Sequence, residues 1–301
     1  MSGQTPTPAL DSCFVCPECH ARLIEEDTQI FCSACKLSFC RQNGIPVFIA
    51  SDQPTRFVEA QHAETVHHEE AWTKLRVGGL PWVKSLEDYR EWLESFYKAG
   101  FYAFGFPSSY FKNLSVLEVG SGPLGMLACV PTQHAVAIDP LMPEFAPYMQ
   151  PHWEATPIRA ASLGEKLPLA DRSFDAAVAI NCLDHTFGPD KIIEEVERVL
   201  KPGGLFFLMN NVKSAAGVAM SAVGERLKIE RLREVYHPHA FTQCSLEREC
   251  KCAGLEMLGC CSMKLSDPLE VVATYGWKAK LKRRLDDEHS LWILARKPEA
   301  S

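Results

Sequence analysis

Apolar residues in the last two thirds of the chain fall into short runs that are separated by turns and by one amphipathic stretch. The runs at 116–119 and 134–138 have the length of single strands. The runs at 174–180 and 205–209 are apolar on both faces, which is typical of strands buried inside a sheet. Between them, apolar residues recur on one side of a helix: Ile192, Ile193, Val196, Val199 and Leu200. This alternation predicts an α/β fold with a doubly wound sheet.

Turn signals predict where these elements end. The sequence LKPGG ends the helix that begins near Ile192, and LFFLMN follows as the next buried strand. A glycine-rich turn after Val119 leads into the apolar start of another helix. Gly254 ends a helix in CSLERECKCAG, and HSLWILAR is the final strand.

The stretch from 52 to 106 has a different pattern. Its first half is polar, and its second half carries Leu86, Tyr89, Trp92, Leu93 and Phe96 at helical spacing. Ser85, three residues before Asp88, is a good helix start. The histidines of the first half (His62, His67 and His68) lie among glutamates, which favours a solvated helix face. The alternative is a lid over a substrate pocket, with one imidazole pointing inward.

Composition narrows the class of protein. The chain has 301 residues, of which 47% are hydrophobic and 23% charged, which is ordinary for a globular protein. Its net charge of −7 argues against a broad nucleic-acid footprint. No apolar run reaches the roughly 18 residues of a membrane-spanning helix. The thirteen cysteines are odd in number and the start has no secretory signal, which predicts reduced thiols in the cytoplasm.

Two CxxC pairs near the amino terminus indicate a metal site. Cys16 and Cys19 form one pair, and Cys32 and Cys35 form the other, with 12 residues between the pairs. Four thiolates at such spacing suit tetrahedral Zn²⁺, which replaces a core too small to be stable alone. The intervening LIEEDTQIF predicts a short hairpin. Cys13 and Cys40 are spare, and we expect them to pack as apolar groups.

The sequence GIPVFI after the second pair predicts the last strand of a zinc ribbon. On these two pairs and this ending, residues 13–50 resemble a family of small zinc-ribbon proteins. The best-known members of that family bind and activate RNA and protein methyltransferases.

A glycine-rich turn and an acid mark a possible cofactor site. Gly120, Gly122 and Gly125 follow the first strand and allow the backbone to approach a ligand. Asp139 ends the next strand, at a distance typical of a ribose-binding acid. Together with GEKLPLADRSFDAAVAINCLDH and GPDKIIEEVERVLKPGGLFFLMN, this region resembles class I S-adenosylmethionine-dependent methyltransferases over about residues 107–297. The resemblance implies a seven-stranded sheet whose last strand is antiparallel.

The resemblance also implies cofactor contacts. Glu118, Gly120, Ser121 and Gly122 match the loop that cradles the methionine part of S-adenosylmethionine, although Glu118 has a second interpretation, in which it orients the loop. Asp139 matches the acid that binds both ribose hydroxyls, with Pro140 beside the adenine. Leu163 stands where many relatives have an adenine-binding aspartate, so backbone near Leu163 and Gly164 takes that role. Asn181 ends the fourth strand beneath the cofactor methyl.

The candidate catalytic residues come from two segments. Asp184 and His185 follow the fourth strand, and a general base at either position removes a proton from the attacking atom. The alternative for His185 is a structural role beside the cofactor. His237 and His239 lie in a loop before the last helix, where loops line the ligand crevice of this architecture. Histidines that only bond the backbone are an equal alternative there.

These patterns divide the chain into a zinc ribbon at 1–51, a helical connector or lid at 52–106 and a methyltransferase domain at 107–301. We expect methyl transfer to a small molecule, a lipid or a natural-product intermediate. Two alternatives stay open. In one, the ribbon docks an RNA or protein substrate; in the other, the chain is a non-catalytic scaffold.

Overall fold

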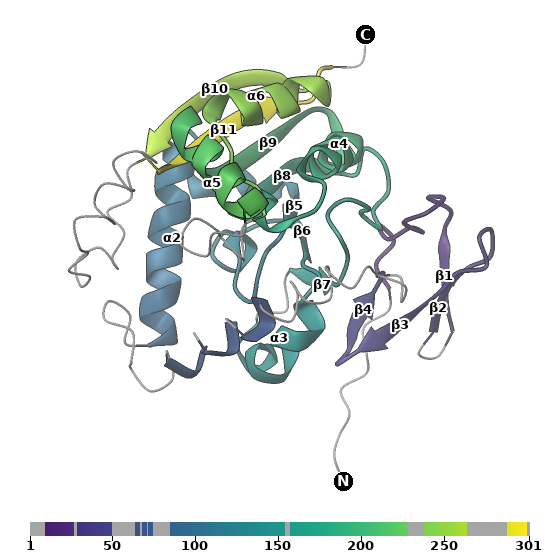
Figure 1. The fold of residues 1–301 in the computed structure, drawn as a ribbon. Coiled ribbons are helices and arrows are strands. Elements are labelled where there is room, and N and C mark those ends of the chain that lie inside the picture. The colour runs from purple at the N-terminus through teal and green to yellow at the C-terminus, as the bar shows by residue number, and fades with distance from the viewer. Residues whose placement is uncertain are drawn as a thin grey trace.

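The computed structural model describes residues 10–26, 29–49, 64–66, 68–70, 72–74, 85–153, 157–227, 238–263 and 288–299. Within these residues, a large sheet has helices on both faces, and a small sheet lies beside it (Figure 1). No described helix combines the length and apolar composition that a bilayer span requires.

The small sheet contains the two cysteine pairs. It has four antiparallel strands in sequence order: β1 (Leu23–Glu26), β2 (Gln29–Cys32), β3 (Ser38–Gln42) and β4 (Ile45–Val47). The β3–β4 turn uses left-handed backbone at Asn43 and Gly44, with φ of 51° and 80°. The predicted hairpin and the predicted closing strand are both confirmed.

The large sheet has seven strands in the order β10-β11-β9-β8-β5-β6-β7. The strands are β5 (Ser115–Val119), β6 (His134–Ile138), β7 (Ile158–Ala160), β8 (Phe174–Ile180), β9 (Leu200–Val212), β10 (Glu256–Met263) and β11 (His289–Arg296). Strands β5 to β9 pair in parallel, and β11 is antiparallel to both β9 and β10. The predicted doubly wound, seven-stranded sheet with an antiparallel last strand is therefore confirmed.

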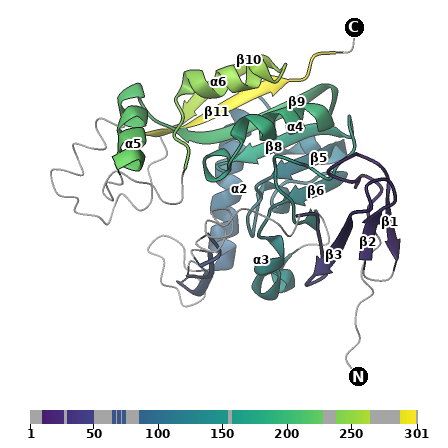
Figure 2. The same cartoon turned by 45° about the vertical axis from the view of Figure 1, so that its right-hand side comes forward.

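Alternating residues of these strands supply two cores. Leu117 and Val119 of β5 face a core that also contains the ribbon and the helices α4 (Pro189–Val199) and α6 (Gln243–Cys252). Val116 faces the other core, formed with α2 (Leu86–Tyr102) and α3 (Met142–Met149). Figure 2 shows α2 and α3 separated from α4 and α6 by the sheet. Other helical elements are α5 (Ala215–Leu227) and the 3-10 turns η1 (Ser108–Asn113), η2 (Met126–Ala128), η3 (Gln150–His152) and η4 (Leu183–His185), and the described residues between 64 and 74 are also helical.

Helix α2 begins as its sequence predicts. The Ser85 hydroxyl oxygen accepts a hydrogen bond from the Asp88 N–H at 3.1 Å, which caps the helix. Leu93 and Phe96 are buried in the core beneath it. Gly100 allows close packing on the sheet, because a Cβ there would lie 2.3 Å from the Trp292 ring.

Two element boundaries differ from the prediction. Strand β9 begins at Leu200, not after the glycines, because the backbone of Gly203 and Gly204 bonds to Lys297 beyond the end of β11. Gly203 reaches this position with φ of 76°. The predicted helix after the glycine-rich turn is only the short turn η2, which Pro131 follows closely.

The ribbon is joined to the large sheet by backbone hydrogen bonds. The Phe48 N–H donates to the Ala161 oxygen at 2.8 Å, and the Ala161 N–H donates to the Pro46 oxygen at 2.9 Å. Phe14, just before the first cysteine pair, forms an antiparallel bridge with Leu169. Strand β4 lies close to β7 and α3 (Figure 1). The ribbon therefore extends the core of the large domain.

Candidate functional site

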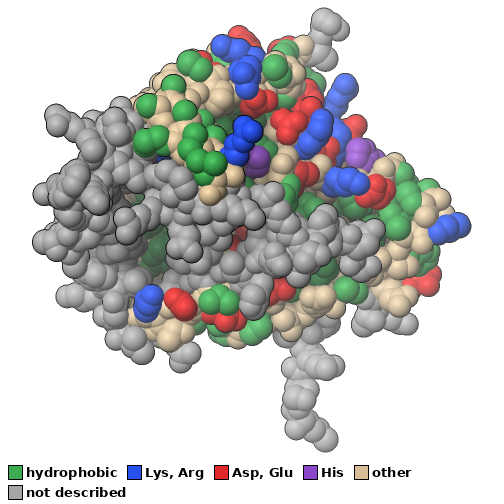
Figure 3. All heavy atoms as spheres, in the orientation of Figure 1, with side chains coloured by type: hydrophobic (Ala, Val, Ile, Leu, Met, Phe, Trp, Pro, Cys, Tyr) green, Lys and Arg blue, Asp and Glu red, His purple; other side chains and the backbone are tan. Residues whose placement is uncertain are grey.

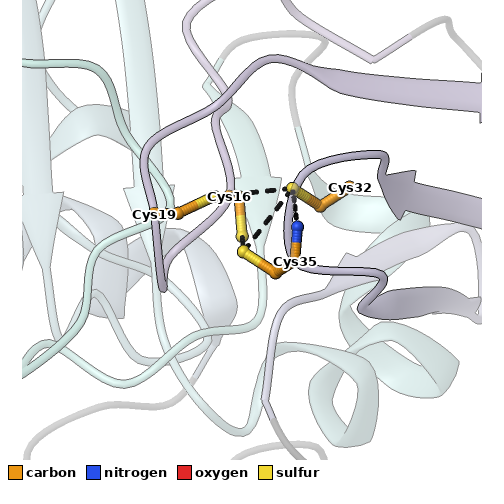
Figure 4. A group of neighbouring side chains, drawn as sticks. All are labelled: Cys16, Cys19, Cys32 and Cys35. Carbon is orange, nitrogen blue, oxygen red and sulfur yellow. Dashed lines mark hydrogen bonds between the residues drawn. The ribbon is translucent and has the colours of Figure 1, made fainter.

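The four cysteines of the two CxxC pairs converge as predicted (Figure 4). Their sulfurs are separated by 3.8 Å between Cys16 and Cys35, 3.6 Å between Cys19 and Cys32, and 3.8 Å between Cys32 and Cys35. A tetrahedral zinc ion with Zn–S bonds of about 2.3 Å requires sulfur separations of about 3.8 Å. The donor set and its separations thus fit a structural zinc ion.

The glycine-rich turn begins directly after β5, at the carboxyl edge of the sheet. Gly120 has φ of 68°, and a Cβ there would lie 2.3 Å from the Cys182 Cβ. Gly122 has φ of 58°, but a Cβ there would meet no atom within 4 Å. Close packing therefore requires the first glycine. The second leaves an open side on which a ligand can approach the backbone.

Glu118 supports the loop that follows this turn. Its two carboxylate oxygens accept hydrogen bonds from the N–H groups of Met126 at 2.7 Å and Leu127 at 3.0 Å. A Cβ at Gly125 would lie 2.4 Å from Glu118 Oε2, so the loop is tightly packed on this side chain. Burial raises the pKa of Glu118 to about 7. These contacts favour the interpretation in which Glu118 orients the loop.

Asp139 lies at the carboxyl end of β6, opposite the glycine turn. Its Oδ2 accepts the Gly122 N–H at 2.8 Å, and its Oδ1 accepts the Leu141 N–H at 2.9 Å. Burial raises the pKa of Asp139, although these two backbone bonds act in the opposite direction. Each oxygen keeps a further lone pair, so the carboxylate can accept two more donors, such as vicinal hydroxyls. Half-buried Pro140 follows it.

The segment after β7 contains the predicted adenine position. The Ser162 hydroxyl donates to the Lys166 oxygen at 3.0 Å and fixes this turn. Gly164 is packed so closely that a Cβ would lie 3.0 Å from both the Ile192 Cδ1 and the Val119 Cγ1. Leu163 is half-buried. The role of this backbone in binding adenine stays a prediction.

The segment after β8 brings three of the four candidate catalytic residues together. Asn181 is exposed at the strand end with φ of 51°, and its N–H donates to the Met209 oxygen at 2.7 Å. Asp184 is buried, and its backbone oxygen accepts the His239 N–H at 3.4 Å. His185 is partly exposed, at 26%. His237 lies outside the described residues.

Glu64 of the connector contacts the segment that follows β8. Its Oε2 lies 3.6 Å from His185 Nδ1, and its Oε1 lies 3.3 Å from His68 Nε2. The His68 ring packs edge-on against Phe145 of α3, with centroids 5.0 Å apart. The expectation of a solvated face is therefore wrong for Glu64 and His68, because both pack onto the large domain. The lid alternative stays a prediction; His62 and His67 lie outside the described residues.

Sequence reasoning missed Glu64 as a site residue. The only local signal was the spacing of Glu64 and His68, which places them one turn apart on a helix. That spacing is equally typical of exposed ion pairs. The contact with His185 joins positions far apart in the chain, so only the fold reveals it.

Comparison with known proteins now assigns the domain. The family model described as "Methyltransferase domain" matches residues 117–208, which include the glycine turn, Asp139 and Asp184. The chain contains a class I S-adenosylmethionine-dependent methyltransferase domain. The matched segment starts in β5 and ends in β9, so it covers the strands that carry the candidate cofactor site.

Curated relatives match part of this chain over part of their own length. An uncharacterized methyltransferase of Mycolicibacterium gilvum is 38% identical over 34% of this chain and 40% of the relative. A thiol S-methyltransferase of Rattus norvegicus is 37% identical over 27% of this chain and 31% of the relative. The chain thus spans less than half the length of these relatives.

A solved structure shares the fold. It is a complex between the Haloferax volcanii Trm112 methyltransferase activator and a methyltransferase, with a TM-score of 0.51 and 17% identity. The match covers 71% of this chain and 94% of the other. At this identity, the likeness describes the fold alone.

Proposed function

We propose that this chain transfers a methyl group from S-adenosylmethionine to a small-molecule acceptor, with lipids and natural-product intermediates included in that class. The methyltransferase domain and the carboxyl-edge position of its glycine turn and Asp139 support this proposal. When bound, the cofactor would supply a methyl group on a positively charged sulfur; the acceptor would attack the methyl carbon, and the sulfur would leave with the bonding electrons. The protein then has to align the acceptor and exclude water.

The cofactor-binding residues we propose surround the glycine turn. Gly120, Ser121 and Gly122 cradle the methionine part, while Glu118 holds the loop behind them. The Asp139 carboxylate accepts the ribose hydroxyls beside Pro140. Backbone at Leu163 and Gly164 contacts the adenine edge, and Asn181 lies beneath the methyl group.

Our proposal for the acceptor class is based on the position of Glu64, which lies between His68 and His185 and contacts both. Glu64 joins the connector to elements that follow β6 and β8, whose carboxyl ends carry the candidate site. A segment packed at this place suits a small enclosed acceptor better than an extended macromolecular surface. The match to a thiol S-methyltransferase supports the same class.

His185 is the catalytic base that we favour. It is partly exposed, and Glu64 lies beside its Nδ1, so a fixed imidazole can accept a proton from the acceptor as the methyl group moves. Asp184, which precedes His185, is buried, and its backbone oxygen accepts the His239 N–H, which ties this segment to the one around His239. Asp184, His237 and His239 remain alternative bases.

The ribbon has a supporting role in this proposal. One zinc ion bound by Cys16, Cys19, Cys32 and Cys35 stabilises residues 1–51, and the pairing with Ala161 supports the segment that leads to Leu163. Residues 52–106 form the lid, and 107–301 form the catalytic domain. None of the thirteen cysteines, all of which lie within the described residues, forms a disulfide, which supports a reducing compartment such as the cytoplasm.

A macromolecular docking role receives less support from the described surface. Around α4 and the ribbon, basic residues are paired with acids, as in Lys166–Glu18, Lys191–Glu194 and Arg198–Asp171. Figure 3 shows basic and acidic described side chains interspersed on this face. Such a surface lacks the one-sided positive potential that attracts nucleic acid.

The test uses methyl-labelled S-adenosylmethionine and a cell extract. Full-length protein and a His185→Asn control are incubated with both, and RNA, protein, lipid and small-molecule fractions are separated. Label in the lipid or small-molecule fraction, reduced in the control, is the expected result. Label in RNA or protein would favour the docking alternative, and cofactor binding without any labelled fraction would favour a scaffold.

A further inference from the structure

A second group of metal-ligand side chains lies where the amino-terminal segment crosses the start of β6. Asp11, Cys13 and His134 each offer one ligand atom, and these atoms lie within 4.8 Å of one another. His134 opens β6, so the group lies at the opposite edge of the sheet from the candidate cofactor site. We propose that these three side chains bind a second zinc ion, which cross-links the amino-terminal segment to the methyltransferase domain.

The separation between the carboxylate and the imidazole supports this assignment. Asp11 Oδ2 lies 3.4 Å from His134 Nε2. This is long for a charge-assisted hydrogen bond, which is typically about 2.7–2.9 Å. Two ligands of a tetrahedral zinc ion with bonds of about 2.0–2.1 Å lie about 3.4 Å apart. The pair is thus spaced like two ligands of one ion.

The amino-terminal half of the group is fixed by its own backbone. The Cys13 N–H donates to Asp11 Oδ1 at 2.9 Å, which leaves Oδ2 directed at His134. The Phe14 N–H donates to the Asp11 oxygen at 3.1 Å and closes the turn. The Ala170 N–H donates to the Cys13 oxygen at 3.0 Å and anchors the turn on the domain. Such second contacts orient metal ligands before the ion arrives.

The histidine is also held in place. The backbone N–H of His134 donates to the Leu114 backbone oxygen at 3.3 Å. The His134 ring stacks on Phe174, with centroids 6.2 Å apart and planes 23° apart. The side chains of His134 and Asp11 are 31% and 26% exposed, so water can reach the group as a fourth ligand. One sulfur, one nitrogen and one oxygen ligand with a water is a donor set that zinc accepts.

The ion would join two residues that are 123 positions apart. It would therefore attach the ribbon to the domain independently of the four-cysteine cluster. This gives Cys13 a role that Cys40, which is exposed on β3, does not share. Cys40 is thus a matched control on the same small module.

The experiment measures zinc in the full-length chain. Wild type and the variants Cys13→Ser, His134→Asn and Cys40→Ser are dialysed against a buffered free zinc concentration, and protein-bound zinc is measured by mass spectrometry of the metal. Wild type and Cys40→Ser should each bind one zinc ion more than Cys13→Ser and His134→Asn. Circular dichroism checks that each variant is folded. Because the readout is the amount of bound zinc, it does not depend on methyl transfer.

Equal zinc content in all four proteins would overturn the proposal and leave an ordinary ion pair between Asp11 and His134. If a variant fails to fold, wild type and Cys40→Ser are titrated in parallel with cobalt in place of zinc. A second binding step with a thiolate-to-cobalt absorption band in both supports the site. Saturation at one ion per chain would contradict it.

Discussion

Val47 of the ribbon and Ala161 of the methyltransferase domain are partners in a parallel β-bridge, two residues before Leu163. This bridge connects the module that we propose to bind zinc to the segment that we assign to the adenine side of the cofactor. Folding of the ribbon and binding of the cofactor should therefore be coupled.

Removal of zinc from the ribbon should weaken cofactor binding as well as stability. Small zinc modules lose their fold when the ion is removed, and β4 would then no longer support Ala161. We expect Cys32→Ser to lower the melting temperature and to raise the Kd of S-adenosylmethionine several-fold, as measured by calorimetry. Cys40→Ser is the control and should change neither. An unchanged Kd in a chain shown to have lost its zinc would separate the ribbon from the cofactor site.

The two glycines of the turn should respond differently to alanine. Gly120→Ala adds a left-handed alanine and a clash with Cys182, so the free energy of unfolding should fall by at least about 2 kcal/mol. Gly122→Ala meets no protein atom, so its stability cost should stay near the roughly 1–2 kcal/mol of left-handed backbone alone. Its main effect should be weaker cofactor binding. Denaturant unfolding and calorimetry on both variants measure this contrast; equal affinity in Gly122→Ala and wild type would place the cofactor elsewhere.

Glu118 should make stability depend on pH. Burial raises its pKa in the folded chain to about 7, above the 4.5 of an ordinary glutamate. A raised pKa means that the folded state holds the proton more tightly, so this contribution is present at low pH and is lost as pH rises towards 7. In cofactor-free protein, the free energy of unfolding of wild type should fall relative to that of Glu118→Gln between about pH 5 and 8. If the difference between the two free energies of unfolding is constant over this range, the pKa of Glu118 is not raised.

His185 should affect the chemical step more than binding. Loss of a general base typically costs about 10²–10⁴ in rate, so His185→Asn should lower kcat by that order once the labelled acceptor is known. Glu64→Gln should have a smaller effect on kcat, because Glu64 only positions the imidazole. Both variants should bind S-adenosylmethionine as wild type does. An unchanged kcat in His185→Asn would move the base to Asp184, His237 or His239.

The sequence predicted those parts of the fold whose signals are local. The β1–β2 hairpin, the Ser85 cap of α2 and the antiparallel last strand follow from periodicity, capping and family resemblance. The start of β9 did not, because Gly203 and Gly204 extend the strand only through bonds to Lys297, far along the chain.

The candidate sites divide in the same way. The four cysteines, Gly120, Gly122 and Asp139 lie in short patterns, so spacing alone locates them. Glu64 beside His185 and Asp11 beside His134 are contacts between distant segments, and no local pattern predicts either pairing. Such pairs become visible only when packing brings the segments together.

The most direct test of the account measures S-adenosylmethionine binding to full-length wild type and Asp139→Asn by titration calorimetry. Asp171→Asn is the matched control, since Asp171 is an aspartate of the same domain that pairs with Arg198 away from the glycine turn. We predict that wild type and Asp171→Asn bind the cofactor alike, and that Asp139→Asn binds it at least roughly 10-fold more weakly, because hydrogen bonds to a charged group contribute about 1.5–3 kcal/mol each. Equal affinity in all three folded proteins would contradict the cofactor site.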